Sequence, residues 1–168
     1  MAKLGEVRKV VAYYLTEPVA SLLARTSITP NAITWFGFGV TIGAAALIVT
    51  EHLFAAGFVV LAAGFFDMLD GALARHTSQT TRFGAILDST LDRLSEAAVL
   101  LGILLLFSLA EEQSILFALV PKEWSILLVG VALLGSLLVS YIRARSEGLG
   151  VECQVGLFTR PGRVIVLA

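Results

Sequence analysis

Long apolar stretches separated by short polar breaks dominate the chain. Four of them reach the roughly 20 residues that a helix needs to cross a bilayer, so each is predicted to be a transmembrane helix. These stretches run over residues 30–50, 53–75, 82–109 and 123–143, with approximate ends. Thr29 and Pro30 are typical of a helix start, and the Glu51-His52 pair marks the first turn. The pattern therefore predicts an all-α protein, a polytopic transmembrane helix bundle.

Both ends of the chain depart from this pattern. Over residues 3–24, apolar residues recur at helical spacing with charged residues around the rest of the helix, which predicts an amphipathic helix in the membrane interface. A soluble helix packed on a partner is the alternative. Pro18 is expected to kink or divide this helix. A polar loop is predicted over 145–156, and another apolar helix is predicted to start near Arg160.

Four aspartates lie where the second apolar stretch ends and the third begins. Asp67 and Asp70 are three residues apart, and Asp88 and Asp92 are four apart, so on a helix each pair shares one face. Carboxylates at the ends of membrane-length helices repel each other and lose hydration, so they need a cation, and divalent metal ions are the natural candidates. The alternative is an ion pathway, which would make the chain a cation-conducting membrane protein.

The aspartates are part of a longer pattern, D-x2-D-G-x2-A-R-x8-G-x3-D-x3-D, whose other fixed positions are Gly71, Ala74, Arg75 and Gly84. This pattern resembles the signature of the CDP-alcohol phosphotransferase family of integral membrane enzymes. The resemblance implies one membrane-embedded domain over 1–168. It implies a family with six spans, so that this chain ends in the fifth. It also implies transfer of a phosphatidyl-type group from a CDP-linked lipid to an alcohol, with release of CMP.

The same resemblance implies a two-metal site. Two Mg²⁺ or Mn²⁺ ions would be held by Asp67, Asp70, Asp88 and Asp92, and they would clamp the attacking and leaving oxygens. Asp92 would serve as a ligand or as the general base for the acceptor hydroxyl, which requires it to lie within hydrogen-bond reach of that oxygen. The resemblance further implies a homodimer.

The resemblance also implies a binding site for the CDP-linked lipid. Gly71 would let the ligand approach the backbone, and Arg75, four residues on along the same helix face, suits a diphosphate. Gly84 would allow tight packing of the second and third spans or access for the nucleotide. The full implied set is Pro30, Asn31, Ala32, Ile33, Gly71, Ala74, Arg75, Thr81 and Gly84.

A second polar group follows the fourth stretch. Arginines that face one cavity bind phosphate well, although arginines at span ends also serve as membrane anchors, and both interpretations stay open. The runs DSTLDR, SYIRAR and RPGR resemble the phosphatidylinositol-phosphate synthase branch of the family, which implies inositol phosphate as acceptor, with glycerol 3-phosphate as the alternative. The implied acceptor-binding residues are Ser140, Arg143, Arg145, Arg160 and Arg163.

Composition and charge narrow the class further. The chain is 57% hydrophobic with a mean hydropathy of +0.88, which is too apolar for an ordinary soluble domain. A net charge of −1 gives no indication of a nucleic-acid partner, and a single cysteine, Cys153, excludes an intramolecular disulfide. Of the 12 Lys and Arg residues, Lys122 alone falls on the far side when the spans alternate. The positive-inside rule therefore predicts that the aspartates face the cytoplasm, in the cell membrane.

Overall fold

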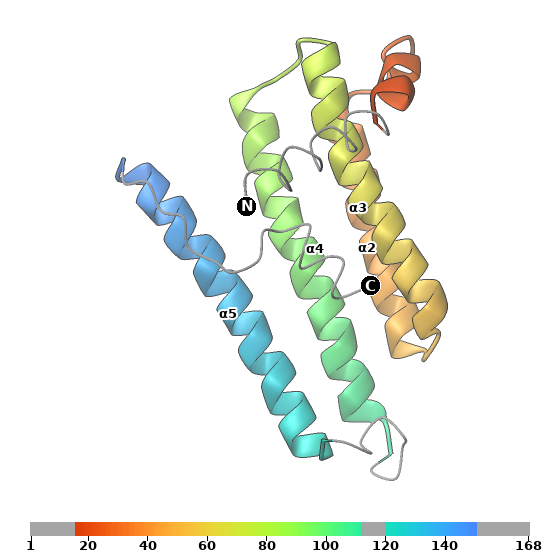
Figure 1. The fold of residues 1–168 in the computed structure, drawn as a ribbon, viewed down its shortest axis with the longest axis vertical. Coiled ribbons are helices and arrows are strands. Elements are labelled where there is room, and N and C mark those ends of the chain that lie inside the picture. Colours follow the sequence, from red (N-terminus) through yellow and green to blue (C-terminus); the bar gives the residue numbers. More distant parts are fainter. Residues whose placement is uncertain (1–15, 112–119, 151–168) are drawn as a thin grey trace, which may run out of the picture.

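The computed structural model of the 168-residue chain describes residues 16–111 and 120–150, and its regular structure within those ranges is helical. A short helical segment at 16–23 comes first (Figure 1). The four long helices are α2 (Pro30–Val49), α3 (Leu53–His76), α4 (Arg82–Leu109) and α5 (Lys122–Gly148). Most of the predicted amphipathic helix at 3–24, and the helix predicted near Arg160, lie outside the described residues.

The helices start and end close to the predicted positions because the sequence carries clear end signals. The Thr29 hydroxyl caps α2 by accepting a hydrogen bond from the Ala32 N–H at 3.3 Å. Thr81 caps α4 in the same way, with the Gly84 N–H donating at 2.9 Å. Glu51 has a φ of 64°, in the left-handed region, and reverses the chain between α2 and α3.

The predicted end of the fourth span was wrong. We predicted a helix to about 143 and a loop from 145, but α5 continues to Gly148. The residues Arg143 to Glu147 are good helix formers or tolerated in helices, so the helix continues until two glycines reduce its stability. Gly150, with a φ of 72°, lies just beyond the helix end. Arg145 is therefore a helical residue.

α2 lies between α3 and α4 and packs against both, while α5 packs against α4 at the edge of the bundle (Figure 1). The approach of α4 to α2 is close at Gly102, where an added Cβ would lie 3.0 Å from the Ala45 carbonyl oxygen. Two apolar clusters form the core. One consists of Ala44, Ile48, Ala56, Val60, Val99 and Leu106, and the other of Ala20, Ile33, Leu69, Ala72 and Leu73.

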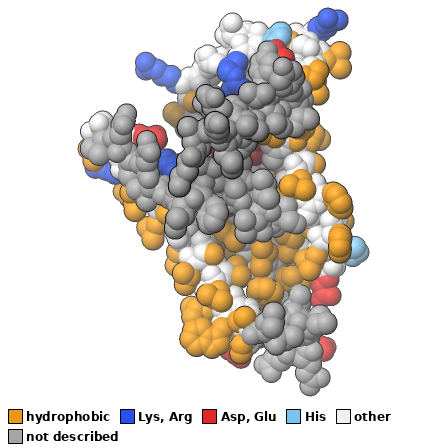
Figure 2. All heavy atoms as spheres, viewed as in Figure 1, with side chains coloured by type: hydrophobic (Ala, Val, Ile, Leu, Met, Phe, Trp, Pro, Cys, Tyr) orange, Lys and Arg blue, Asp and Glu red, His pale blue; other side chains and the backbone are white. Residues whose placement is uncertain are grey.

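Three of the described helices, α2, α3 and α5, are long and apolar enough to cross a membrane. α4 has 28 residues and is also long enough, but its part up to residue 96 carries Asp88, Asp92, Arg93 and Glu96. The predicted polytopic helix bundle is confirmed, and α4 packs between α2 and α5. Its prediction as a membrane span stays a prediction. Figure 2 shows hydrophobic side chains over the lower part of the bundle and Lys and Arg side chains toward the upper end.

Candidate functional site

The four aspartates lie toward one end of the bundle. Asp67 and Asp70 are on the last part of α3, Asp88 and Asp92 are on the first part of α4, and the short loop at 77–81 joins the two helices. Asp70 and Asp92 are buried, with 4% and 8% of their surface exposed, and the other two are half-buried. Asp70 is close enough to Asp67 and Asp88 for their negative charges to repel one another. The fold thus brings carboxylates from both helices together.

Asp70 has an unusual environment for a buried acid. The hydroxyl of Thr34, from α2, and the backbone amide of Gly71 lie beside its carboxylate. Its Oδ2 atom is buried and has no hydrogen-bond partner among the described residues. Burying a carboxylate oxygen without a hydrogen-bond donor or a cation beside it costs on the order of several kcal/mol. An oxygen in this position is suited to a ligand that carries positive charge.

The donor set fits a hard divalent cation in its chemistry, because Mg²⁺ and Mn²⁺ prefer carboxylate oxygens. Across residues 16–111 and 120–150, no group of three or more Asp, Glu, His or Cys side chains is gathered closely enough to enclose a metal ion. The fit therefore rests on the four carboxylates and on the unpartnered Oδ2 of Asp70. Arg93 contributes a positive charge nearby, with its Nη1 atom 3.8 Å from Asp92 Oδ2.

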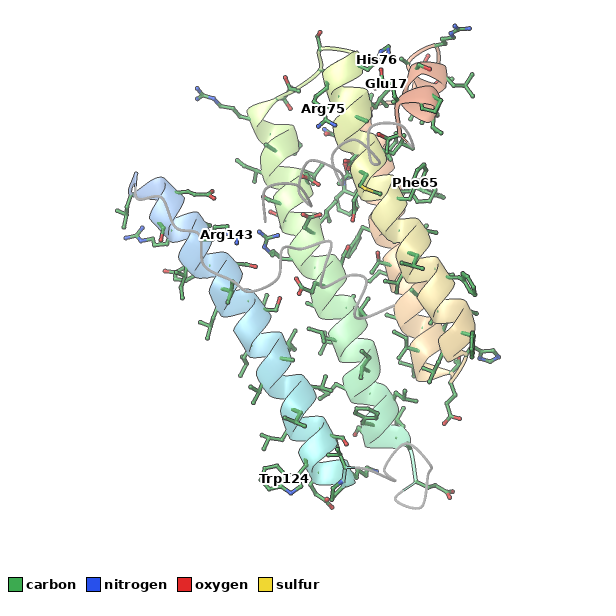
Figure 3. The ribbon with its side chains drawn as sticks, in the orientation of Figure 1. Glu17, Phe65, Arg75, His76, Trp124 and Arg143 are labelled. Atoms are coloured by element: carbon green, nitrogen blue, oxygen red, sulfur yellow. The ribbon has the colours of Figure 1, made fainter. Side chains whose placement is uncertain are left out.

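Gly71 and Arg75 are in contact, as their spacing on α3 predicts. A Cβ added at Gly71 would lie 3.4 Å from Nη1 of Arg75, so the arginine side chain folds back over the glycine. Figure 3 shows Arg75 near the end of α3, beside the loop that leads to α4. Arg75 is exposed and Ala74 is half-buried. Gly71 and Arg75 thus lie together at the end of α3, and their role in binding the CDP-linked lipid stays a prediction.

Gly84 had two predicted roles, tight packing of the second and third spans or access for the nucleotide. The packing role was wrong, because the helix that Gly84 packs against is the first span, α2, and access for the nucleotide stays a prediction. A Cβ at Gly84 would lie 3.3 Å from Oδ1 of Asn31 and 3.0 Å from Oγ1 of Thr81. The correction follows from the position of α2 between α3 and α4. It places Asn31, Thr81 and Gly84 together at the start of α2 and α4.

The other residues at the start of α2 have different environments. Pro30 is half-buried, Ala32 is exposed, and the Ile33 side chain is buried in the core with Leu69 and Leu73. Ile33 therefore holds the first turn of α2 against α3. A ligand at this end of the bundle would meet the backbone of that turn, together with Asn31 and Ala32.

The predicted acceptor residues are described only in part. Ser140 is buried, Arg143 is half-buried and Arg145 is exposed, all on α5. Arg143 lies on the side of α5 that faces α4 (Figure 3). Arg160 and Arg163 lie outside the described residues. A phosphate site that uses arginines from both segments stays a prediction.

Sequence reasoning missed two residues of α2. Thr34 lies beside Asp70, and Gly37 lies where an added Cβ would be 3.2 Å from the Cβ of Phe66 and 3.6 Å from Oδ1 of Asp67. Their three-residue spacing places them on one helix face. A threonine and a glycine one turn apart in an apolar helix were the available signal, but nothing local showed which helix they would meet.

A contact between His76 and Glu17 ties the first described segment to this end of the bundle. His76 Nε2 lies 3.7 Å from Glu17 Oε1, and both side chains are about one third exposed, at 37% and 36% (Figure 3). Ala20 also packs with α3 residues in the core. The segment at 16–23 therefore covers the end of α3 that follows the first aspartate pair.

The fold and the site define a class of protein. It is a helical integral membrane protein that brings acidic residues from two helices, and basic residues, to the same end of its bundle. The family model described as CDP-alcohol phosphatidyltransferase matches residues 27–162. The chain therefore belongs to the CDP-alcohol phosphatidyltransferase family. The predicted family and its transferase class are confirmed.

The relatives carry closely related names. Phosphatidylinositol phosphate synthase of Mycobacteroides abscessus is 36% identical over 154 residues, which is 91% of this chain and 66% of the relative. Archaetidylinositol phosphate synthase of Methanothermobacter thermautotrophicus is 36% identical over 165 residues, which is 98% of this chain and 74% of the relative. The predicted resemblance to the phosphatidylinositol-phosphate synthase branch is confirmed.

Crystal structures of the phosphatidylinositol phosphate synthase of Mycobacterium tuberculosis have the same fold. The structure with CDP-DAG bound gives a TM-score of 0.80 at 35% identity, over 91% of this chain and 73% of that one. The structure in complex with manganese and citrate gives 0.79 at 36% identity, over 90% and 68%. The chain thus spans about two thirds to three quarters of the length of the proteins that it matches.

Proposed function

We propose that the chain transfers a phosphatidyl-type group from a CDP-linked lipid to inositol phosphate, with release of CMP, as a phosphatidylinositol-phosphate synthase. The observation that carries the proposal is Asp70, which is buried beside Asp67 and Asp88 with one oxygen lacking a partner among the described residues. Its family and the names of its relatives support the reaction. Both named relatives make an inositol phosphate lipid, although their lipid names differ, which favours inositol phosphate over glycerol 3-phosphate.

Two divalent ions, Mg²⁺ or Mn²⁺, are part of the proposal. Asp67, Asp70, Asp88 and Asp92 would hold them, and a manganese-bound structure of a relative supports the choice of metal. When bound, such ions neutralise the charge that develops on the diphosphate oxygens. They also offset the repulsion among the carboxylates, because two divalent cations balance four negative charges.

Other residues of the chain bind the CDP-linked lipid and accept the proton of the acceptor. The Arg75 guanidinium binds the diphosphate through charge-assisted hydrogen bonds. The start of α2 from Pro30 to Ile33, with Thr81 and Gly84 at the start of α4, borders the CDP group. The acceptor hydroxyl oxygen forms a bond to the lipid-side phosphorus, the bond from that phosphorus to the bridging oxygen breaks, and CMP leaves. Asp92 serves either as a metal ligand or as the general base that accepts the proton of the hydroxyl.

The acceptor phosphate is assigned to the second polar group. Ser140, Arg143 and Arg145 on α5 would bind it, together with Arg160 and Arg163. An arginine contact to phosphate is often bidentate, and its loss costs about 1.5–3 kcal/mol. That energy corresponds to about 10- to 150-fold in affinity.

The cellular setting belongs to the same proposal. The chain would lie in the cytoplasmic membrane as a multi-pass protein with its aspartates at the cytoplasmic face, and it would form a homodimer. The exposed basic residues Arg25, Arg75 and Arg82 at the end of the bundle that carries the 77–81 loop support this orientation.

The test is CMP release by purified protein supplied with CDP-diacylglycerol and a panel of acceptors. Inositol phosphate is expected to be the best acceptor, ahead of glycerol 3-phosphate and free inositol. Arg145→Ala should raise the KM for inositol phosphate about 10- to 150-fold and leave the KM for the lipid unchanged. Arg25→Ala, an exposed arginine at the same end of the bundle, is the matched control. Release of CMP with no acceptor preference would remove inositol phosphate from the proposal, and no release with any acceptor would overturn the transferase reaction.

A further inference from the structure

Two buried threonines lie on one face of α2. Thr34 and Thr41 are seven residues apart, close to two helical turns, and are 5% and 6% exposed. Each hydroxyl donates a hydrogen bond to the carbonyl oxygen four residues earlier, Thr34 to Pro30 and Thr41 to Gly37, both at 3.1 Å. The two threonines therefore have the same backbone role and the same burial.

They differ in what lies across the helix interface. Thr34 is beside the carboxylate of Asp70, on α3. A hydroxyl carries a single proton, so the Thr34 hydroxyl has two acceptors to choose between, the Pro30 carbonyl and the Asp70 carboxylate. A hydrogen bond to a charged acceptor is roughly twice as strong as one to a neutral acceptor. The charged carboxylate is therefore the stronger of the two acceptors.

The position of Thr34 suits control of the carboxylate. Asp70 is almost fully buried, so water does not fix its orientation, and its Oδ2 atom has no hydrogen-bond partner in the described ranges. One turn further along α2, Gly37 allows close approach to Asp67, so the same face of α2 meets both aspartates of α3. A hydroxyl on a rigid helix that holds one carboxylate oxygen leaves the other oxygen pointing at a cation.

We propose that Thr34 is a positioning residue for Asp70, whose hydroxyl fixes the carboxylate so that its Oδ2 faces a divalent cation. This inference rests on the proposed role of Asp70 as a metal ligand. Thr34 itself touches neither the reacting atoms nor the metal. Its loss should therefore act through the affinity of the site for the ion, as removal of a partner behind a metal ligand commonly does.

The experiment measures Mn²⁺ binding to the purified full chain by titration, together with CMP release at saturating Mn²⁺. Thr34→Val removes the hydroxyl and keeps the shape, Thr34→Ala removes it with a smaller side chain, and Thr34→Ser keeps it. Thr41→Val is the matched control, because it removes the same backbone hydrogen bond from the same helix face. We expect Thr34→Val and Thr34→Ala to weaken Mn²⁺ binding about 10-fold or more, with turnover recovering at high Mn²⁺, whereas Thr34→Ser and Thr41→Val bind as the parent does.

Several results would overturn the inference. Mn²⁺ affinity of Thr34→Val equal to that of the parent would show that the hydroxyl does not position Asp70. Equal losses in Thr34→Val and Thr41→Val would assign the effect to packing within α2. A parent that binds Mn²⁺ but releases no CMP would defeat the proposed function and leave the positioning role standing, and a parent that binds no Mn²⁺ would defeat both.

Discussion

Asp70 is buried, and it lies close to two other carboxylates and to one hydroxyl from a neighbouring helix. Repulsion from Asp67 and Asp88 opposes the fold when no cation is bound, because Asp70 is almost fully buried and the two other carboxylates are close enough to repel it. A bound divalent ion reverses the sign of that contribution. The acidic site should therefore link metal binding to the stability of the whole bundle.

The first prediction concerns this linkage. In the parent, Mn²⁺ at 100 times its dissociation constant should stabilise the folded chain by about 2.7 kcal/mol. Asp70→Asn should abolish both this stabilisation and CMP release, and should make the metal-free chain more stable than the metal-free parent, because one repelling charge is gone. Thermal unfolding with and without Mn²⁺ measures the effect.

Glu123→Gln is the control for that measurement, since Glu123 is an exposed acid in the first turn of α5. It should leave the Mn²⁺ effect intact. An Asp70→Asn variant that is still stabilised by Mn²⁺ to the parental extent would contradict the ligand role. Asp92→Asn separates two roles, because retained Mn²⁺ binding with lost turnover would identify Asp92 as the base.

At the scale of the elements, α2 holds the site together because small residues let its neighbours approach. Gly102 brings α4 close to Ala45, and Gly37 brings α2 close to the α3 segment that carries Asp67. In a membrane, helices gain little from hydrophobic contact with one another, so close backbone packing contributes more of the association. The positions of the aspartates on α3 and α4 thus depend on small residues some distance along the helices.

The second prediction tests this packing. At Gly102 an added Cβ would lie 3.0 Å from backbone oxygen and 3.2 Å from a Cα, so Gly102→Ala should force α4 away from α2. We expect a loss of about 1–3 kcal/mol of stability. Gly130→Ala on α5 is the control, because nothing lies within 4 Å of its added Cβ and alanine favours the helix by up to about 1 kcal/mol. Unfolding in a denaturing detergent measures both, and equal stability of the two variants would contradict the close approach.

Helix positions were predictable from the sequence because apolar stretches end at clear signals, such as Thr29 with Pro30 and the cap at Thr81. The arrangement of the helices in space could not be predicted from the sequence. A lipid-facing residue and a helix-facing residue are equally apolar, so the sequence did not reveal that α2 separates α3 from α4. That is why Gly84 was assigned to the wrong neighbour and why Thr34 was missed. Spacing did place each aspartate pair on one helix face, since that inference needs only local geometry.

At the scale of the whole molecule, exposed basic side chains lie at one end of the long axis of the bundle. The loop at 77–81 lies at the end that carries Arg25, Arg75 and Arg82, and the turn at Glu51 and His52 lies at the far end of α3. This separation gives the proposed orientation a direct test.

The third prediction is that a cysteine at Gln79 reacts with an impermeant thiol reagent from the cytoplasmic side only. A cysteine at His52 should react from the opposite side only. Both positions are exposed, and Cys153→Ser removes the natural thiol from the background. Labelling of sealed vesicles of known orientation gives the answer. The reverse pattern would overturn the orientation and place the site away from soluble inositol phosphate.

The position of α2 between α3 and α4 also bears on how the chain is synthesised. α2 leaves the ribosome before both of its neighbours, although it ends up between them. α3 can pack on α2 as soon as it is inserted, so Thr34 meets Asp70 while α4 is still being translated. α4 then arrives on the other side of α2 and brings Asp88 and Asp92. A nascent chain arrested before α4 therefore carries only Asp67 and Asp70 of the four aspartates, and the site cannot be completed until α4 is inserted.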